Sequence, residues 1–161
     1  MESPPPPSPS LLLARGADKI NVLDKFLQKL DAIGVVIVAA SGNAPPSQYS
    51  ISIGAAITQQ PQLWSLTPGL SNMIVVGASD QLSRATEFSI EIVGMLWAPG
   101  ENIWVAKYGA GMEKQQGTSL AAPLVAGLVA YMCGTSATRY ARPADVKVEL
   151  RALGSGREHS H

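Results

Sequence analysis

The sequence predicts an α/β fold built around a mostly parallel sheet. Three short apolar runs, at residues 34–40, 73–78 and 93–98, do not alternate with polar residues, and this pattern is typical of strands buried on both faces. Segments with helical periodicity precede the first run and follow the last one. With 161 residues, of which 46% are hydrophobic and 15% charged, the chain is long enough for one such domain.

The N-terminal part contains a tail, a helix and the first strand. Residues 1–16 are rich in proline and serine, and we expect a disordered tail because they cannot bury enough apolar surface to order themselves. Apolar residues then recur every three to four positions between Asp18 and Ile33, which predicts an amphipathic helix that ends near Gly34. The first strand follows directly.

The middle of the chain is predicted to hold a long loop, two strands and a hairpin. Residues 48–72 are weakly patterned, which indicates a surface loop with room for a short helix or hairpin. The strands at 73–78 and 93–98 come next. Residues 103–107 and 112–116 are expected to pair across a glycine-rich turn.

Two helices close the domain. Residues 120–133 are almost entirely apolar, and we expect this helix to be buried on nearly all sides. Residues 143–153 open with proline and are followed by glycine, which predicts an amphipathic helix. The domain therefore covers residues 17–153, and residues 154–161 are expected to form a flexible tail.

Composition argues against several classes of partner. Twelve basic and twelve acidic residues balance without a run of either sign, so we expect neither a nucleic acid nor an anionic membrane as partner. The single cysteine, Cys133, lies at helical spacing in an apolar run and is expected to pack in the core. No uninterrupted apolar run reaches the roughly 18 residues of a membrane span, and the opening residues carry no secretory signal.

Ser119 is the first residue that suggests chemistry. A serine at the start of a helix is commonly a cap for the unpaired amide groups. The alternative is a nucleophile, since Gly117 allows close backbone approach and small residues after Ser119 leave room for another chain. The start of a helix also favours developing negative charge.

The segment at residues 117–127 (G-T-S-L-A-A-P-L-V-A-G) resembles the serine signature of the subtilisin-like serine peptidases, G-T-S-x-A-x-P-x-x-x-G, at every fixed position. Three further segments resemble that family in the same order, at residues 36–43 (V-I-V-A-A-S-G-N), 67–80 (T-P-G-L-S-N-M-I-V-V-G-A-S-D) and 97–100 (W-A-P-G). The resemblance covers about residues 18–153. It implies the C-terminal half of a catalytic domain, a partial three-layer sandwich whose N-terminal strands are missing.

The resemblance implies a serine endopeptidase mechanism. Ser119 would attack a peptide carbonyl, and Asn43 would hold the developing oxyanion together with the backbone amide of Ser119. Both side chains are then expected to face one cleft. The backbone of Ala40, Ser41 and Gly42 would form a wall of the first specificity pocket, and the small size of two of these residues suits that role.

The family's base and its orienting carboxylate have no matching motif in this sequence. The mechanism needs a histidine to accept the serine proton and an aspartate to orient that histidine. The two histidines, His159 and His161, stand in the C-terminal tail. In subtilisin itself, loss of the histidine costs roughly 2 × 10⁶ in rate, so we expect the chain by itself to be inactive. A non-catalytic peptide-binding or regulatory fragment is the main alternative, and a structural domain in which Ser119 is only a cap is another.

The resemblance also bears on cofactors and partners. No cofactor is expected; some family members bind calcium through an aspartate before the A-P-G turn, but Met95 stands at the matching position. A peptide or protein substrate is the implied partner, and the N-terminal half of the domain is a second. Family members are commonly secreted or vacuolar, whereas this sequence shows no export signal. The Thr67–Pro68 bond is expected to be cis, as in the matching family segment.

Overall fold

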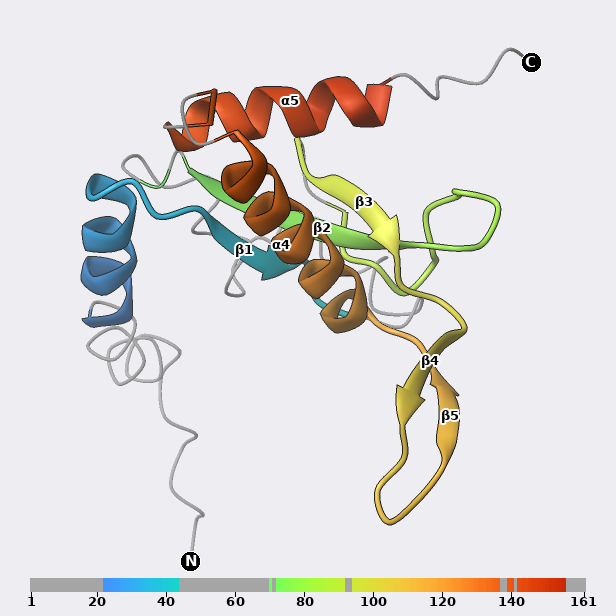
Figure 1. Cartoon of the computed structure of the whole chain (residues 1–161). Coiled ribbons are helices and arrows are strands. Elements are labelled where there is room, and N and C mark those ends of the chain that lie inside the picture. The colour runs from blue at the N-terminus through green and yellow to red at the C-terminus, as the bar shows by residue number, and fades with distance from the viewer. Residues whose placement is uncertain are drawn as a thin grey trace, which may run out of the picture.

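The computed structural model of the chain (Figure 1) describes residues 22–43, 70, 72–91, 94–136, 139–140 and 142–155. The predicted tail at residues 1–16, the Thr67–Pro68 bond, most of the predicted loop and both histidines lie outside the described residues.

A parallel three-stranded sheet forms the centre of the fold. Strands β1 (Ile37–Ala40), β2 (Met73–Ser79) and β3 (Leu96–Pro99) lie in the order β1-β2-β3, and both pairs are parallel. The prediction of parallel strands from the three apolar runs is confirmed. Strand β2 is central and every residue of it is buried, because among the described strands it alone has a neighbour on each side, and a helix covers each of its faces.

Helices cover both faces of this sheet, which gives three layers. Alternate residues of β2 point to opposite sides: Ile74 and Val76 join the core under α4 (Thr118–Thr135), while Met73 and Val75 pack against Leu27. Leu27 belongs to the N-terminal helix at residues 22–32. The fold is therefore the predicted α/β sandwich with part of the sheet.

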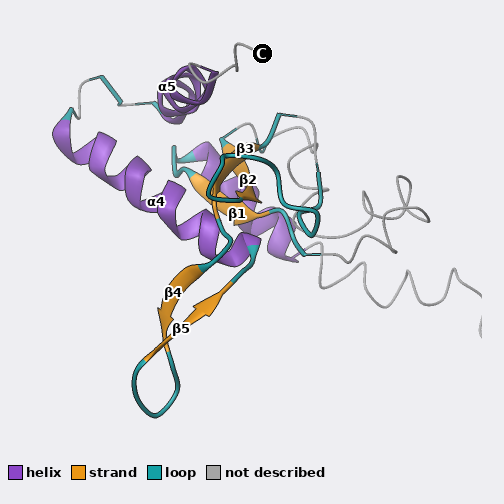
Figure 2. Ribbon diagram, turned by 90° about the vertical axis from the view of Figure 1, so that its right-hand side faces the viewer, coloured by secondary structure: helices purple, strands orange, loops and turns teal. Residues whose placement is uncertain are grey.

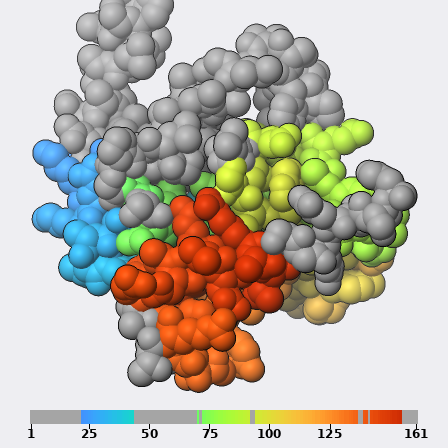
Figure 3. Space-filling model, turned by 90° about the horizontal axis from the view of Figure 1, so that it is seen from above, coloured from blue at the N-terminus to red at the C-terminus, as the bar shows by residue number. Residues whose placement is uncertain are grey.

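The helix at residues 22–32 and the C-terminal helix α5 (Pro143–Ser155) complete the described layers. Asp31 fixes the first helix to the start of β2 by accepting a hydrogen bond of 2.8 Å from the backbone N–H of Asn72. Helix α5 contributes Val146 and Leu150 to the core under α4. In the space-filling view (Figure 3), α5 lies at the centre of the face seen, with the N-terminal helix to one side.

Helix α4 is buried on one face only, so the expectation that it is buried on nearly all sides was wrong. Its core face consists of Thr118, Ala121, Ala122, Val125, Val129 and Met132. On the outer face, Leu124 is 50% exposed and Tyr131 is 68% exposed. Among the described residues, the sheet covers one face of α4, but no layer covers its opposite face. An apolar helix is enclosed only when both of its faces are covered.

Helix α4 also bears on the prediction about membrane spans. By length and composition it is the one helix in the described part that could cross a membrane, although only 33% of its residues are buried. Thr118, Ser119 and Thr135 lie at its ends, so its apolar run is shorter than the helix. Helix α4 packs on all three parallel strands, as the core helix of a globular domain does.

Strands β4 (Ile103–Ala106) and β5 (Met112–Gln115) form the predicted antiparallel hairpin, with Ile103 opposite Gln115. The hairpin projects away from the sheet (Figure 2) and leads directly into α4. Its base is tied to the end of β3, since the N–H of Gly117 donates to the carbonyl of Gly100 at 2.8 Å. The hairpin thereby fixes where α4 begins.

Candidate active site

The candidate site lies where the carboxyl end of β1 meets the first turn of α4. Asn43 stands three residues after the last residue of β1, and Ser119 is the second residue of α4. Gly42, the residue before Asn43, has φ 99°, a conformation that L residues rarely adopt. A glycine there lets the chain turn sharply at the end of the strand and brings Asn43 over the helix start.

Ser119 is not the helix cap. The cap position is Gly117, which has no side chain to donate or accept a capping hydrogen bond. Ser119 is exposed and lies in the first turn, where backbone N–H groups have no partner within the helix. The interpretation of Ser119 as a cap is therefore wrong, and its hydroxyl remains accessible at the positive end of α4.

Asn43 is joined to α4 by hydrogen bonds to Thr118. Its side-chain oxygen Oδ1 accepts from the backbone N–H and from the hydroxyl of Thr118, each at 3.0 Å. The Thr118 hydroxyl accepts in turn from the N–H of Gly42 at 3.2 Å. Thr118 is only 1% exposed, so the Thr118 end of the network that connects the strand end to the helix start is shielded from water.

The structure brings the amide of Asn43 and the hydroxyl of Ser119 to one point. A Cβ atom built on Gly117 would lie 3.1 Å from Asn43 Nδ2 and 3.2 Å from Ser119 Oγ. The two polar atoms therefore face the same space beside Gly117, although 76 positions separate the residues. Asn43 and Ser119 are both exposed, so a molecule in solution can reach both residues; that they face one cleft stays a prediction.

The predicted wall residues have different environments. Ala40 ends β1, and the N–H of Ser41 continues the ladder by donating to the carbonyl of Val76 at 2.8 Å. Ser41 is fully buried, so its side chain does not face the surface beside Asn43. Gly42 is half-buried, and its carbonyl accepts from the N–H of Ile90 at 3.2 Å.

The segment around Ser89 also supports the site, and the sequence analysis missed it. Ser89 is buried, forms a bridge with Asn43, and accepts a hydrogen bond of 2.9 Å from the N–H of Ala78. Thr86 lies 2.8 Å from Ser89 Oγ. Neither residue stands in a recognisable motif, so only their contacts reveal that they hold the turn that carries Asn43.

The described titratable groups with shifted pKa values do not serve Ser119. The backbone N–H of Arg84 is the main hydrogen-bond donor that holds the pKa of Asp80 below its ordinary value. Burial lowers the pKa of Lys147, whose ammonium donates to the carbonyl of Met73 at the opposite end of the sheet from Asn43. None of the described residues is a histidine, so this part of the chain shows no base for the serine.

Met95, which stands where some family members bind calcium through an aspartate, does not fit that ion. Met95 packs beside the apolar cluster of Leu27, Leu70, Met73 and Val75, and calcium requires oxygen ligands. Within the described ranges there is also no group of three or more His, Cys, Asp or Glu side chains that could hold a metal.

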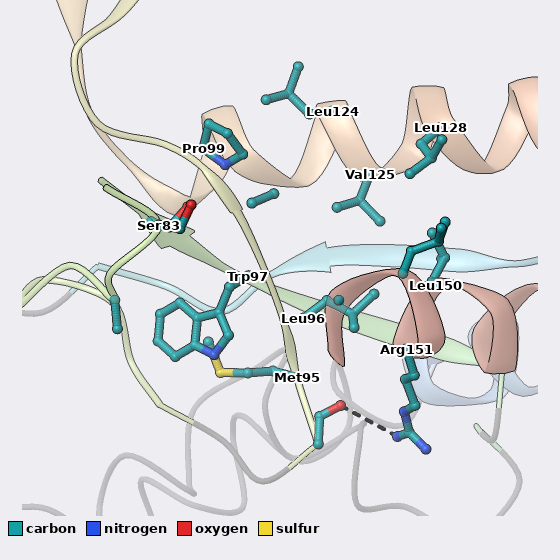
Figure 4. A pocket seen from close by; sticks show the side chains of 16 residues that line it. Ser83, Met95, Leu96, Trp97, Pro99, Leu124, Val125, Leu128, Leu150 and Arg151 are labelled. Carbon is teal, nitrogen blue, oxygen red and sulfur yellow. Dashed lines mark hydrogen bonds between the residues drawn. The ribbon is translucent and has the colours of Figure 1, made fainter. Parts of the chain in front are cut away.

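A separate hollow of about 1110 Å³ lies between the outer edge of β3, α4 and α5 (Figure 4). Its lining is mostly apolar, with Leu124 and Leu128 from α4 and Trp97 from β3, and Arg151 is the charged side chain at its rim. The guanidinium donates to the carbonyl of Gly94 at 3.5 Å. Neither Asn43 nor Ser119 lines this hollow, so it is not part of the candidate site.

Comparison with known proteins identifies the class to which this fold and site belong. The model of the Subtilase family matches residues 12–152, and the chain belongs to this family. It is similar to Subtilisin-like protease 3 of Pseudogymnoascus destructans, with 27% identity over 146 residues, which cover 89% of this chain and 33% of that protein. It is also similar to M-protease of Shouchella clausii, with 32% identity over 109 residues, or 67% of this chain and 25% of that protein.

Solved structures agree with this assignment. A cold adapted subtilisin-like serine proteinase superposes with a TM-score of 0.63 and 26% identity, over 82% of this chain and 43% of that one. The self-cleaved protease domain of PatA gives a TM-score of 0.54 with 27% identity, over 78% and 43% of the two chains. The chain thus has a partial subtilisin-like fold, and it spans a quarter to a third of the length of the two curated relatives named above.

Proposed function

We propose that this chain supplies the nucleophile and an oxyanion donor of a subtilisin-like serine endopeptidase. The observation that carries the proposal is the convergence of Asn43 Nδ2 and Ser119 Oγ beside Gly117. A donor and a nucleophile serve one reaction only when a single carbonyl group can reach both. The structure supports that requirement, because both atoms lie on the same side of Gly117, 3.1 and 3.2 Å from the point where its Cβ would stand.

The proposed step is attack of Ser119 Oγ on the carbonyl carbon of a peptide bond. The carbonyl π electrons move to oxygen, and the resulting oxyanion accepts hydrogen bonds from Asn43 Nδ2 and the backbone N–H of Ser119. The backbone of Ala40, Ser41 and Gly42 would flank the side chain that precedes the cleaved bond. The serine proton must pass to a base, which the described residues lack, so we propose that the chain by itself does not turn over peptides.

The base and its orienting carboxylate would come from the N-terminal half of the domain as a second partner. Two surfaces support this: within the described part β1 pairs only with β2, and the outer face of α4 exposes apolar side chains. Each is a surface that a further strand or helix would cover.

Chemical rescue tests the proposal. Ser119 should react with a fluorophosphonate probe only slowly, and imidazole added as an external base should accelerate the labelling. Ser119→Ala should abolish it, while Ser136→Ala, a serine at the far end of α4, should leave it unchanged. Peptide anilides should not be hydrolysed without imidazole. Labelling that persists in Ser119→Ala, or that ignores imidazole, would contradict the proposal.

A second candidate is a non-catalytic fragment that binds peptides at the same surface. The absence of a histidine among the described residues favours it. This candidate predicts peptide binding without any imidazole-dependent labelling of Ser119. The same experiment therefore separates the two functions, and upstream coding sequence with in-frame D-T-G and H-G-T motifs would favour the peptidase.

A further inference from the structure

We propose that the hollow between β3, α4 and α5 binds the anionic form of a fatty acid, with the carboxylate at Arg151 and the hydrocarbon chain along the apolar wall. This site is separate from Asn43 and Ser119 and goes beyond the proposed function. The hollow has a volume of about 1110 Å³. It is large enough for such a ligand, since small-molecule sites commonly enclose about 300–1,000 Å³.

The wall of the hollow suits a linear hydrocarbon chain. Leu124 and Leu128 stand one turn apart on α4, and Trp97 faces the same space from β3 (Figure 4). Leu150 and Leu153 supply a similar pair from α5. Trp97 is 39% exposed, Leu128 40% and Leu153 58%. These side chains therefore keep apolar surface that a bound hydrocarbon chain would remove from water.

The rim of the hollow suits a carboxylate. Among the described residues that line it, Arg151 is the charged one and none is acidic. The guanidinium donates to the carbonyl of Gly94 at 3.5 Å, which is longer than the roughly 2.7–3.2 Å of an ordinary N–H···O hydrogen bond. None of the ion pairs in the described part of the chain involves Arg151. Its planar guanidinium can therefore bind a carboxylate through two parallel hydrogen bonds.

Lys147 makes the surroundings of Arg151 more positive. The two residues stand one turn apart on α5. Burial is the main cause that lowers the pKa of Lys147, and the charge of Arg151 adds to this effect, whereas the charge of Asp31 opposes it. The two cations are thus close enough to interact. A carboxylate gains from this positive potential, but an uncharged head group does not.

Fluorescence quenching of Trp97 tests the proposal. The tryptophans of the chain are Trp64, Trp97 and Trp104, so Trp64→Phe and Trp104→Phe in the full chain leave Trp97 as the single emitter. Titration with 11-bromoundecanoate, kept below the concentration at which it forms micelles, should quench this emission along a saturable curve. The uncharged alcohol 11-bromoundecanol has the same chain and should bind about fivefold more weakly, the upper end of the contribution of an exposed ion pair.

Arg151→Gln should remove the preference for the carboxylate over the alcohol. Arg142→Gln is the matched control, because Arg142 stands directly before α5 and pairs with Asp145; it should keep the preference. An unchanged preference in Arg151→Gln would overturn the proposal.

The comparison of the two ligands needs no change at Arg151, so it decides even if Arg151→Gln does not fold. Equal affinity for the carboxylate and the alcohol, or quenching that does not saturate, overturns the proposal. Quenching that is lost as the chain concentration rises at a constant excess of ligand would mean that a second copy fills the hollow, and it also overturns the proposal. None of these readouts depends on Ser119, so failure here is distinguishable from failure of the proposed function.

Discussion

Replacement of Gly117 by alanine tests the geometry of the site most directly. Gly117 has φ 153°, outside the region that L residues favour. An added Cβ would lie 3.1 Å from Asn43 Nδ2 and 3.2 Å from Ser119 Oγ. The methyl group would therefore crowd the proposed donor and the proposed nucleophile, and these side chains would have to move by a few tenths of an ångström.

The expected loss of stability follows from the backbone. A non-glycine residue in a sparsely populated conformation costs about 1–3 kcal/mol. For a domain of this size each 1 kcal/mol lowers the melting temperature by about 2–4 °C, so Gly117→Ala should lower it by roughly 2–12 °C. Labelling of Ser119 in the presence of imidazole should fall as well, because the methyl group displaces Asn43 Nδ2 and Ser119 Oγ from their positions.

Gly127→Ala provides the matched control on the same helix. Gly127 lies inside α4, and a Cβ built there meets nothing within 4 Å. Alanine in a helix interior is favoured over glycine by about 0.5–1 kcal/mol, so this variant should melt at a higher temperature than the wild type. Thermal unfolding followed by circular dichroism measures both variants. If Gly117→Ala is as stable as the wild type and still labels at Ser119, the geometry derived for the site is incorrect.

Two further predictions concern the oxyanion donor and pH. Asn43→Ala should lower imidazole-dependent labelling of Ser119 by about 10²–10³, a magnitude measured for the matching asparagine of subtilisin itself; an effect below threefold would argue against Asn43 as a donor. The depressed pKa of Asp80 contributes stability that is fully present above its unfolded pKa, near 3.8, and is lost as pH falls through the lower folded value. Asp80→Asn should therefore flatten the decline of the melting temperature below about pH 4, and an unchanged decline would exclude Asp80 as its source.

Most elements of the fold could be predicted because their signals are local. The runs that became β1 and β2 are continuous and rich in β-branched residues, and the hairpin has two short segments around a glycine-rich turn. The predicted boundaries of the elements were less accurate. Strand β3 begins at Leu96 and not at residue 93, and α5 ends at Ser155 and not at residue 153. Ends of elements depend on hydrogen bonds with distant segments, which local patterns do not record.

The environment of α4 could not be derived from its composition. Its apolar residues surround the helix, so the pattern predicts burial on every side, whereas Leu124 and Tyr131 are exposed in the described structure. Periodicity reports which residues favour burial, but it does not report whether a covering layer is present. That depends on which strands and helices pack beside α4.

The sequence by itself determined the family, the parallel strands and the two residues that carry the proposed chemistry, since short motifs and hydrophobic patterns are properties of neighbouring positions. Only the tertiary structure showed that Gly117 caps α4, that Thr118 holds the carboxamide of Asn43, and that Nδ2 and Ser119 Oγ meet beside Gly117. These contacts join positions about 75 residues apart. They form because parallel pairing places the end of β1 beside the end of β2, and the hairpin then delivers the first turn of α4 to the same edge of the sheet.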